Sequence, residues 1–193
     1  MVLVAVVSQL AVPALVSDGI EDRLTQGGGR ATAEVEAFPS ARLLFGDGDR
    51  LEVRGEGLDL ELEVGENDGL SELDGFDEVD MRLESFRTGP IEVDSFELAR
   101  SGTQPYTLRM SGSSTASALA QVGAAALDAG ALGELGAAFF GGALGAAAVP
   151  LDLDLRLRSD DGTARVVGGQ ATAAGFDVTP LAGVIASTVA IKV

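Results

Sequence analysis

Residues 151–167, LDLDLRLRSDDGTARVV, decide the fold class of this chain. From Leu151 to Arg158, leucine alternates with aspartate or arginine, so one face of the segment is apolar and the other is charged. This period of two is typical of a half-buried β-strand. Residues 159–162, SDDG, have the composition of a turn, and residues 164–167 run back from it. The stretch therefore predicts an antiparallel β-hairpin.

Shorter alternating segments precede this hairpin between residues 31 and 110. Each carries apolar residues on one face and polar or acidic residues on the other, and turns rich in Gly, Pro, Asn or Ser separate them. The segments are residues 31–37, 51–53, 58–64, 79–83, 91–93, 96–98 and 106–110. Together they predict an α+β fold built on a strongly twisted antiparallel sheet.

Residues 111–150 have a different pattern, because Asp128 and Glu134 are their only charged residues. Hydroxyl residues 113–115 are N-cap candidates, and apolar residues then recur at helical spacing. Seven glycines between 123 and 145 would each cost a helix about 1 kcal/mol relative to alanine, so this helix needs cover from protein or lipid. We expect the sheet to curve around this long Ala/Gly-rich helix. A transmembrane span over residues 135–151 is the disfavoured alternative, because Ala and Gly are weakly hydrophobic and no interfacial anchor flanks it.

Both ends of the chain have helical patterns. The first 16 residues carry no charge, which fits a signal-peptide or membrane-anchor remnant but falls short of the roughly 20 residues of a full span. An apolar first helix or strand of the domain is the alternative. From Pro13, helical spacing predicts a short helix that ends at glycines 27–29. Thr179 and Pro180 begin a predicted C-terminal helix. We divide the chain into residues 1–16 and a single domain of residues 17–193.

Composition excludes several chemistries. The chain has no Cys and no His, so thiol nucleophiles, imidazole-ligated zinc and Ser-His-Asp triads are absent. A net charge of -17 disfavours nucleic acid as a partner. Asp47-Gly48-Asp49 lacks the spacing of a calcium loop. Fifteen of the 30 acids lie between Glu56 and Glu97, and we interpret them as a solvated sheet face. We expect no enzyme activity, metal or cofactor.

Several short motifs occur in a fixed order along most of the chain. They are residues 18–24, 37–46 (AFPSARLLFG), 111–119 (SGSSTASAL), Pro150 with the strand after it, 160–167 (DDGTARVV), 174–175 and 180–182. In this order the chain resembles the bacterial DUF2993 family, also called LmeA-like phospholipid-binding proteins of actinobacterial cell envelopes. The resemblance implies a tubular lipid-binding-like fold. It also implies an extracytoplasmic protein, membrane-anchored or secreted into a periplasm-like space, that binds phospholipid in an elongated apolar groove.

The function that the sequence favours is the binding of an apolar ligand by hydrophobic burial. Each buried methylene contributes about 0.8 kcal/mol, so an apolar trough can hold a phospholipid or another acyl-chain lipid without headgroup contacts. The candidate lining residues are Phe45, Leu119, Val122, Leu132, Leu135, Phe139, Phe140 and Leu144. Each of them could instead be ordinary core. We expect a monomer that can associate with membranes through its N-terminal apolar segment. A structural or interaction domain of the envelope is the alternative, and a carboxylate-dependent hydrolase is a distant one.

Overall fold

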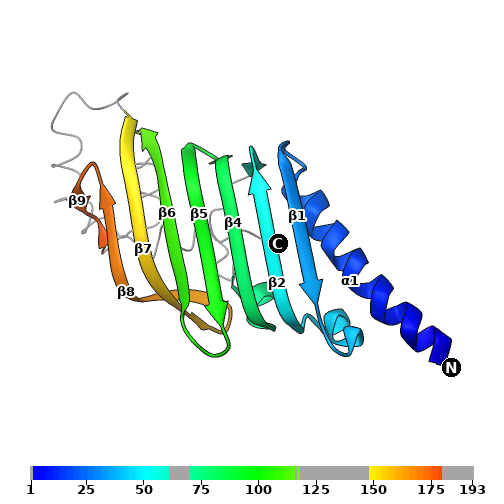
Figure 1. Cartoon of the computed structure of the whole chain (residues 1–193). Coiled ribbons are helices and arrows are strands. Elements are labelled where there is room, and N and C mark those ends of the chain that lie inside the picture. The colour runs from blue at the N-terminus through cyan, green and yellow to red at the C-terminus, as the bar shows by residue number, and fades with distance from the viewer. Residues whose placement is uncertain (1, 61–69, 116, 118–147, 180–193) are drawn as a thin grey trace.

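The computed structural model of the chain describes residues 2–60, 70–115, 117 and 148–179 (Figure 1). These residues form a mixed α+β structure in which a large, twisted, open sheet dominates and helices are few. The helix α1 (Val2–Leu24) lies at one edge of the sheet, and its N-terminal end projects beyond that edge (Figure 1). In the part of the chain described here, no helix is long and apolar enough to cross a membrane.

The described strands form one nine-stranded sheet with the order β1-β2-β4-β5-β6-β7-β8-β9, and β3 pairs with β4 off this path. The strands are β1 (Arg30–Glu36), β2 (Gly48–Glu56), β3 (Asp59–Leu60), β4 (Phe76–Thr88), β5 (Ile91–Ser101), β6 (Tyr106–Thr115), β7 (Ala148–Asp160), β8 (Thr163–Ala173) and β9 (Phe176–Asp177). Two short helical elements interrupt them. They are the 3-10 helix η1 (Ser40–Phe45) and α2 (Ser71–Asp74).

The predicted hairpin of residues 151–167 is confirmed as β7 and β8. Asp160 pairs with Thr163 across a two-residue turn. Asp161 and Gly162 have φ values of 52° and 83°, the positive values that a type I′ turn needs. Both strands are longer than the alternating segments because backbone pairing continues to Ala173.

The expectation of an antiparallel sheet is confirmed for most strand pairs and is wrong for two, both of which involve β4. β2 and β4 are parallel, with Leu51 opposite Val79 and Val53 opposite Met81, and β3 also pairs with β4 in parallel. Alternation shows which face of a strand is buried, but both strand directions place alternate side chains on the same face. The pattern therefore carries no information on the direction of a neighbour.

The predicted helix start at residues 113–115 is also wrong. These residues belong to β6, where Ser113 pairs with Pro150 and Ser114 with Val149 of β7. The buried Ser114 hydroxyl donates a 2.9 Å hydrogen bond to the Pro90 carbonyl oxygen. A serine hydroxyl can satisfy a carbonyl beside a strand as well as cap a helix, so composition alone misplaced this boundary. The predicted Ala/Gly-rich helix lies chiefly in residues 118–147, and the C-terminal helix in residues 180–193, both outside the described residues. The predicted strand over residues 58–64 is described only as β3.

A bulge explains a break in the alternation of β5. Residues 91–93 and 96–98, predicted as separate segments, belong to one strand whose register against β6 shifts between Val93 and Ser95. The extra residue leaves Asp94 and Ser95 exposed together before Phe96 returns to the core. A break in period two therefore marked a bulge rather than a turn.

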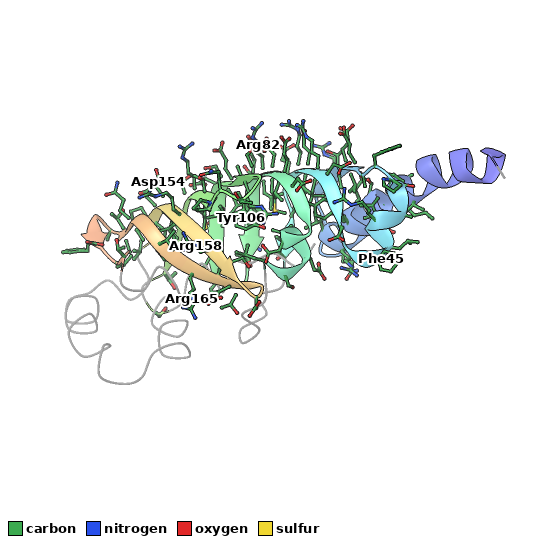
Figure 2. All side chains as sticks on the ribbon, turned by 90° about the horizontal axis from the view of Figure 1, so that it is seen from below. Phe45, Arg82, Tyr106, Asp154, Arg158 and Arg165 are labelled. Atoms are coloured by element: carbon green, nitrogen blue, oxygen red, sulfur yellow. The ribbon has the colours of Figure 1, made fainter. Side chains whose placement is uncertain are left out.

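The sheet has one apolar and one charged face. Leucine, valine, phenylalanine and methionine side chains of β2 and β4–β7 are buried on the apolar face, with Val53, Leu83 and Leu155 fully enclosed. Charged side chains such as Arg82 and Asp154 project from the other face (Figure 2). The N-terminal helix is longer than the pattern predicted. It runs without a break from Val2 through Pro13 to Leu24 and packs against β1 and η1.

Candidate functional site

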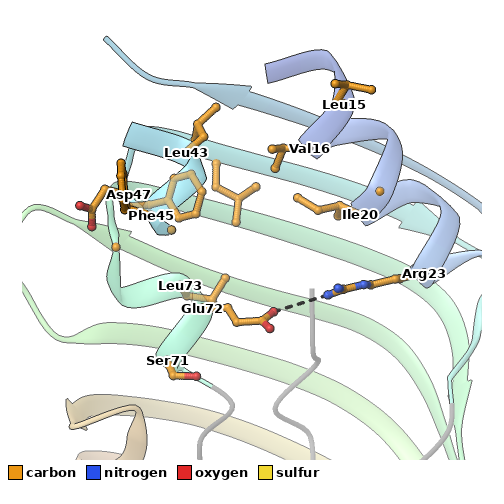
Figure 3. Close-up of a pocket in the computed structure, with 15 residues that line it drawn as sticks. Leu15, Val16, Ile20, Arg23, Leu43, Phe45, Asp47, Ser71, Glu72 and Leu73 are labelled. Carbon is orange, nitrogen blue, oxygen red and sulfur yellow. Dashed lines mark ion pairs between the residues drawn. The ribbon is translucent and has the colours of Figure 1, made fainter. Parts of the chain in front are cut away.

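A pocket of about 640 Å³ lies between α1, η1 and α2 at the β1 end of the sheet (Figure 3). Its lining comes from several segments that are apart in sequence. From α1 these are Leu15, Val16, Gly19, Ile20 and Arg23; from η1 and the turn after it, Leu43, Phe45, Gly46 and Asp47; and from β2, α2 and the start of β4, Leu51, Ser71, Glu72, Leu73, Gly75 and Phe76.

The inner wall of the pocket is apolar. Ile20, Leu43, Leu51, Leu73 and Phe76 belong to the buried core, and each presents part of its side chain to the cavity. The mouth is also apolar but exposed, since Leu15 is 70% and Phe45 is 83% accessible to solvent. An apolar wall that continues outward into exposed apolar side chains is suited to a ligand with a long hydrocarbon portion.

Charged groups sit only at the rim. Arg23 Nη1 lies 3.9 Å from Glu72 Oε2, and both side chains are more than half exposed (Figure 3). Asp47 stands on the η1 side of the opening. An exposed ion pair of this length contributes little to stability, about 0–1 kcal/mol. The rim therefore offers one guanidinium and two carboxylates that can exchange partners at small cost.

Helix α1 is held against the sheet by an edge contact. β1 is the edge strand, and its Ala33 N–H donates a 2.8 Å hydrogen bond to Glu21 Oε1 of α1. On the same side of the helix Leu24 is almost completely buried. Glu21 thus satisfies an edge donor that would otherwise be open to another strand, and it positions Ile20 and Arg23 at the pocket.

The η1 wall is fixed by one carboxylate. Asp49 accepts hydrogen bonds of 2.6 Å from Arg42 Nη1 through Oδ1 and from the Phe38 N–H through Oδ2. Gly46 then ends η1 in the left-handed conformation, with φ 79°. Asp49 was part of the rejected calcium motif, and its role here is to hold η1. No cluster of acidic residues among the described residues is arranged to hold a metal ion.

Two backbones approach very closely behind the mouth. The Gly48 N–H donates a 3.0 Å hydrogen bond to the Gly75 carbonyl oxygen. A Cβ added at Gly75 would lie 1.9 Å from the Gly46 carbonyl oxygen, far inside van der Waals contact. Glycine is therefore required at Gly75, because the turn after η1 and the end of α2 pack backbone against backbone.

Asp74 connects α2 to side chains of β5, β6 and β7. Its Oδ1 accepts hydrogen bonds from Tyr106 Oη at 2.9 Å and from Arg100 Nη1 at 3.2 Å, and its Oδ2 accepts one from Ser159 Oγ. Arg100 Nη2 also donates to the carbonyl oxygens of Leu73, Asp74 and Phe76. The cluster joins α2 to β5, β6 and β7. A four-residue helix is too short to be stable alone, and these bonds keep Leu73 in the pocket wall.

Tyr106 is the most enclosed member of this cluster, with 1% of its surface exposed. The Arg100 guanidinium lies 4.6 Å from the centroid of its ring, at cation–π distance. Burial raises the pKa of Tyr106 well above its ordinary value, and the Asp74 carboxylate adds to the increase while Arg100 opposes it. The phenol therefore stays protonated and acts as a hydrogen-bond donor.

The charged face of the sheet shows no catalytic arrangement among the described residues. Glu52 accepts hydrogen bonds from both Arg54 and Arg50, its neighbours along β2, and these bonds lower the pKa of Glu52. Arg82 and Asp80 form a similar pair on β4 at 2.8 Å. These carboxylates are therefore engaged by arginines of their own strands on the charged face.

Of the eight predicted lining residues, the structure places Phe45 at the pocket mouth. The other seven, Leu119, Val122, Leu132, Leu135, Phe139, Phe140 and Leu144, lie outside the described residues. The lining from α1 and α2 was missed. The spacing of Leu15, Ile20 and Leu24 indicated an apolar helix face, but not what that face would contact. For Leu73 there was no usable signal, because α2 is shorter than one and a half helical turns.

Comparison with family models, curated proteins and solved structures finds no match for the chain. The class of protein is therefore defined by its own geometry. It is an α+β protein with an open, mostly antiparallel sheet and an apolar pocket of about 640 Å³ at one end. The likeness to the DUF2993 family stays a prediction from the sequence.

Proposed function

We propose that this protein is a non-catalytic lipid-binding protein, and that an acyl chain of a phospholipid or related lipid occupies the pocket between α1, η1 and α2. One observation carries this proposal. The apolar inner wall of a 640 Å³ pocket continues outward to the exposed side chains of Leu15 and Phe45. Pockets for small ligands commonly measure about 300–1,000 Å³, so the volume is suitable for one such ligand.

The expected affinity follows from the hydrophobic effect. Each buried methylene contributes about 0.8 kcal/mol, and a single 14-carbon chain associates with a bilayer with a constant of about 10⁴ M⁻¹. One chain in the pocket should therefore bind with a Kd on the order of 100 μM. A second chain or a headgroup contact at the rim would be needed for tighter binding. Arg23 and Glu72 are the rim groups placed to supply that contact.

The wider assignment is part of the same proposal. The DUF2993-like motifs, the uncharged first 16 residues and the nearly uncharged stretch from 111 to 150 support an extracytoplasmic envelope protein with a longer, tubular lipid-binding groove. The seven leucine, valine and phenylalanine candidates between 119 and 144 belong to this wider proposal.

A pocket-filling variant tests the proposal. Gly19 lines the pocket, and a Cβ added there meets nothing within 4 Å. Gly19→Phe should fill the cavity without disturbing the helix backbone, whereas Gly19→Ala should leave it open. We expect native mass spectrometry with added phospholipid to detect a lipid-bound species of the wild type, and uptake of a fluorescent phospholipid to fall at least tenfold in Gly19→Phe only.

Two outcomes would contradict the proposal. A wild-type protein that is purified free of lipid and takes up no fluorescent phospholipid does not bind lipid, which would favour the alternative of a structural or interaction domain. Equal uptake by Gly19→Phe and Gly19→Ala would show that lipid binds at another place. Turnover of an ester or glycoside that is abolished by an Asp or Glu substitution would favour the hydrolase.

A further inference from the structure

Large apolar side chains are exposed at two places in the described residues. Val167 and Phe176 lie at the β8–β9 end, and the other four lie at the opposite end of the sheet. These four are Leu15 of α1, Phe38, and Leu44 and Phe45 of η1. We use the name mouth patch for Leu15, Leu44 and Phe45, which belong to the two elements that form the pocket mouth.

The geometry of η1 explains why its apolar residues separate. A 3-10 helix has three residues per turn, so three consecutive side chains point in three directions. In the run Leu43-Leu44-Phe45 the first side chain is buried, whereas Leu44 is 71% and Phe45 is 83% exposed. The core needs only one of the three. The other two are large apolar groups presented to solvent at the rim of an apolar pocket.

The mouth patch is continuous with an uncharged part of α1. Leu15 belongs to that helix, and the chain carries no charged residue before Asp18. The N-terminal end of α1 extends away from the sheet beyond β1 (Figure 1). Binding to a membrane interface strengthens with the apolar area that is buried in it, and this uncharged part of α1 lies next to the exposed apolar side chains of the mouth patch.

The negative charge of the protein indicates which headgroup charge a bound bilayer should have. The chain has a net charge of -17, and the arginines of α1 and η1 are each paired with an acid. Arg42 pairs with Asp49 and Arg23 with Glu72. No surplus of positive charge is available here for anionic headgroups, which favours a bilayer with an electrically neutral surface.

We propose that the mouth patch docks onto a zwitterionic lipid bilayer. Leu44 and Phe45 insert beside α1 at the boundary between headgroups and acyl chains, so that the pocket opens toward the bilayer. The docking is supported by the exposed side chains of the mouth patch, by the uncharged part of α1 next to it and by the paired arginines. The added consequence, that a lipid passes from bilayer to pocket without crossing water, rests on the proposed function.

Tryptophan reporters can test the docking, because the chain has no Trp of its own. Leu44→Trp places the reporter in the mouth patch but outside the pocket lining, and Phe176→Trp places a matched reporter on the exposed β9, where Phe176 is 59% exposed. With phosphatidylcholine vesicles, we expect a blue-shifted and stronger emission for Leu44→Trp only. Replacing the lipid with its acyl-brominated form should quench Leu44→Trp at least twofold more than Phe176→Trp.

A third reporter separates the docking from lipid binding. Phe45→Trp lies at the pocket mouth and should be quenched by a short-chain brominated phosphatidylcholine below its critical micelle concentration. Quenching of Phe45→Trp by monomers without any vesicle effect on Leu44→Trp would overturn the docking and leave the proposed function standing. A vesicle effect on Leu44→Trp without monomer quenching of Phe45→Trp would support the docking and contradict the pocket function.

Two further outcomes decide between occupants. A blue shift of Leu44→Trp that rises with protein concentration in the absence of vesicles would show that a second copy of the chain covers the mouth patch, and it would overturn the proposal. Vesicles with 30 mol% phosphatidylglycerol should bind several-fold more weakly at low salt than neutral vesicles. Stronger binding to the anionic vesicles would contradict the charge argument.

Discussion

Tyr106 Oη on β6 donates a 2.9 Å hydrogen bond to Asp74 Oδ1 on α2, and this bond joins the middle of the sheet to the wall of the pocket. Asp74 also accepts hydrogen bonds from Arg100 and Ser159, so side chains of three strands contact one carboxylate at the end of a four-residue helix. The opposite end of α2 contributes Ser71 and Glu72 to the pocket. The shape of the candidate site therefore depends on a polar cluster that lies outside the pocket lining.

Tyr106 should titrate only when the protein unfolds. It is the only tyrosine of the chain, so absorbance of the phenolate near 295 nm reports on it alone. Burial raises its pKa in the folded state. The stabilisation that its neutral form contributes is therefore complete below the unfolded value of about 10 and is lost as the pH rises above that value.

We expect the phenolate signal of the native protein to rise together with the loss of the β-sheet circular dichroism signal. In concentrated urea, Tyr106 of the unfolded chain should titrate near pH 10. A phenolate signal that develops near pH 10 while the circular dichroism spectrum stays native would show that Tyr106 is accessible to water.

Asp74→Asn should destabilise the protein by about 3 kcal/mol, because it leaves the guanidinium of Arg100 without its carboxylate in a site where that side chain is only 11% exposed. Urea unfolding followed by circular dichroism measures the change. The matched control is Asp80→Asn, which breaks a 2.8 Å ion pair with Arg82 on the exposed face and should cost less than about 1 kcal/mol. Equal losses in the two variants would show that the Asp74 cluster has no special structural role.

Gly75→Ala should destabilise the protein by about 1–3 kcal/mol, because its Cβ would overlap the Gly46 carbonyl oxygen at 1.9 Å and backbone must move to relieve the contact. Because Gly46 borders the pocket mouth, lipid uptake should fall as well. Gly19→Ala is the control, since its Cβ meets nothing within 4 Å and alanine in a helix is favoured by about 0.5–1 kcal/mol. A gain of stability in both variants would mean that the turn after η1 can shift freely.

Glu52 should contribute to the acid sensitivity of the protein. Hydrogen bonds from Arg54 and Arg50 lower its pKa in the folded state. The stabilisation is therefore present above the unfolded value of about 4.3 and is lost as the pH falls through the lower folded value. The melting temperatures of wild type and Glu52→Gln should differ at neutral pH and converge as the pH falls through the lowered folded pKa of Glu52.

The control for this comparison is Asp94→Asn, which removes one negative charge from the exposed bulge of β5. It accounts for the general benefit of reducing a net charge of -17. If Asp94→Asn and Glu52→Gln follow the same curve at every pH, the arginines beside Glu52 add nothing beyond net charge.

Local pattern was enough to identify most of the described strands. The alternation in residues 151–158 specified a strand, its buried face and the hairpin that follows, because side chains in a strand point to opposite faces with a period of two. The spacing of Leu15, Ile20 and Leu24 likewise specified a helix, in which Ile20 and Leu24 are buried and Leu15 is exposed. The absence of His and Cys excluded several chemistries before any fold was considered.

Only the tertiary structure decided which elements are neighbours. Three features join residues that are distant along the chain. They are the parallel pairing of β2 with β4, the pairing of β6 with β7 through Ser114 and the hydrogen bonds to Asp74. The pocket is the clearest case, because it gathers side chains from Leu15 to Phe76 around a cavity that no single segment contains. Periodicity records which face of each element is apolar. The identity of the surface that covers that face depends on packing energies between segments, which a one-dimensional pattern does not contain.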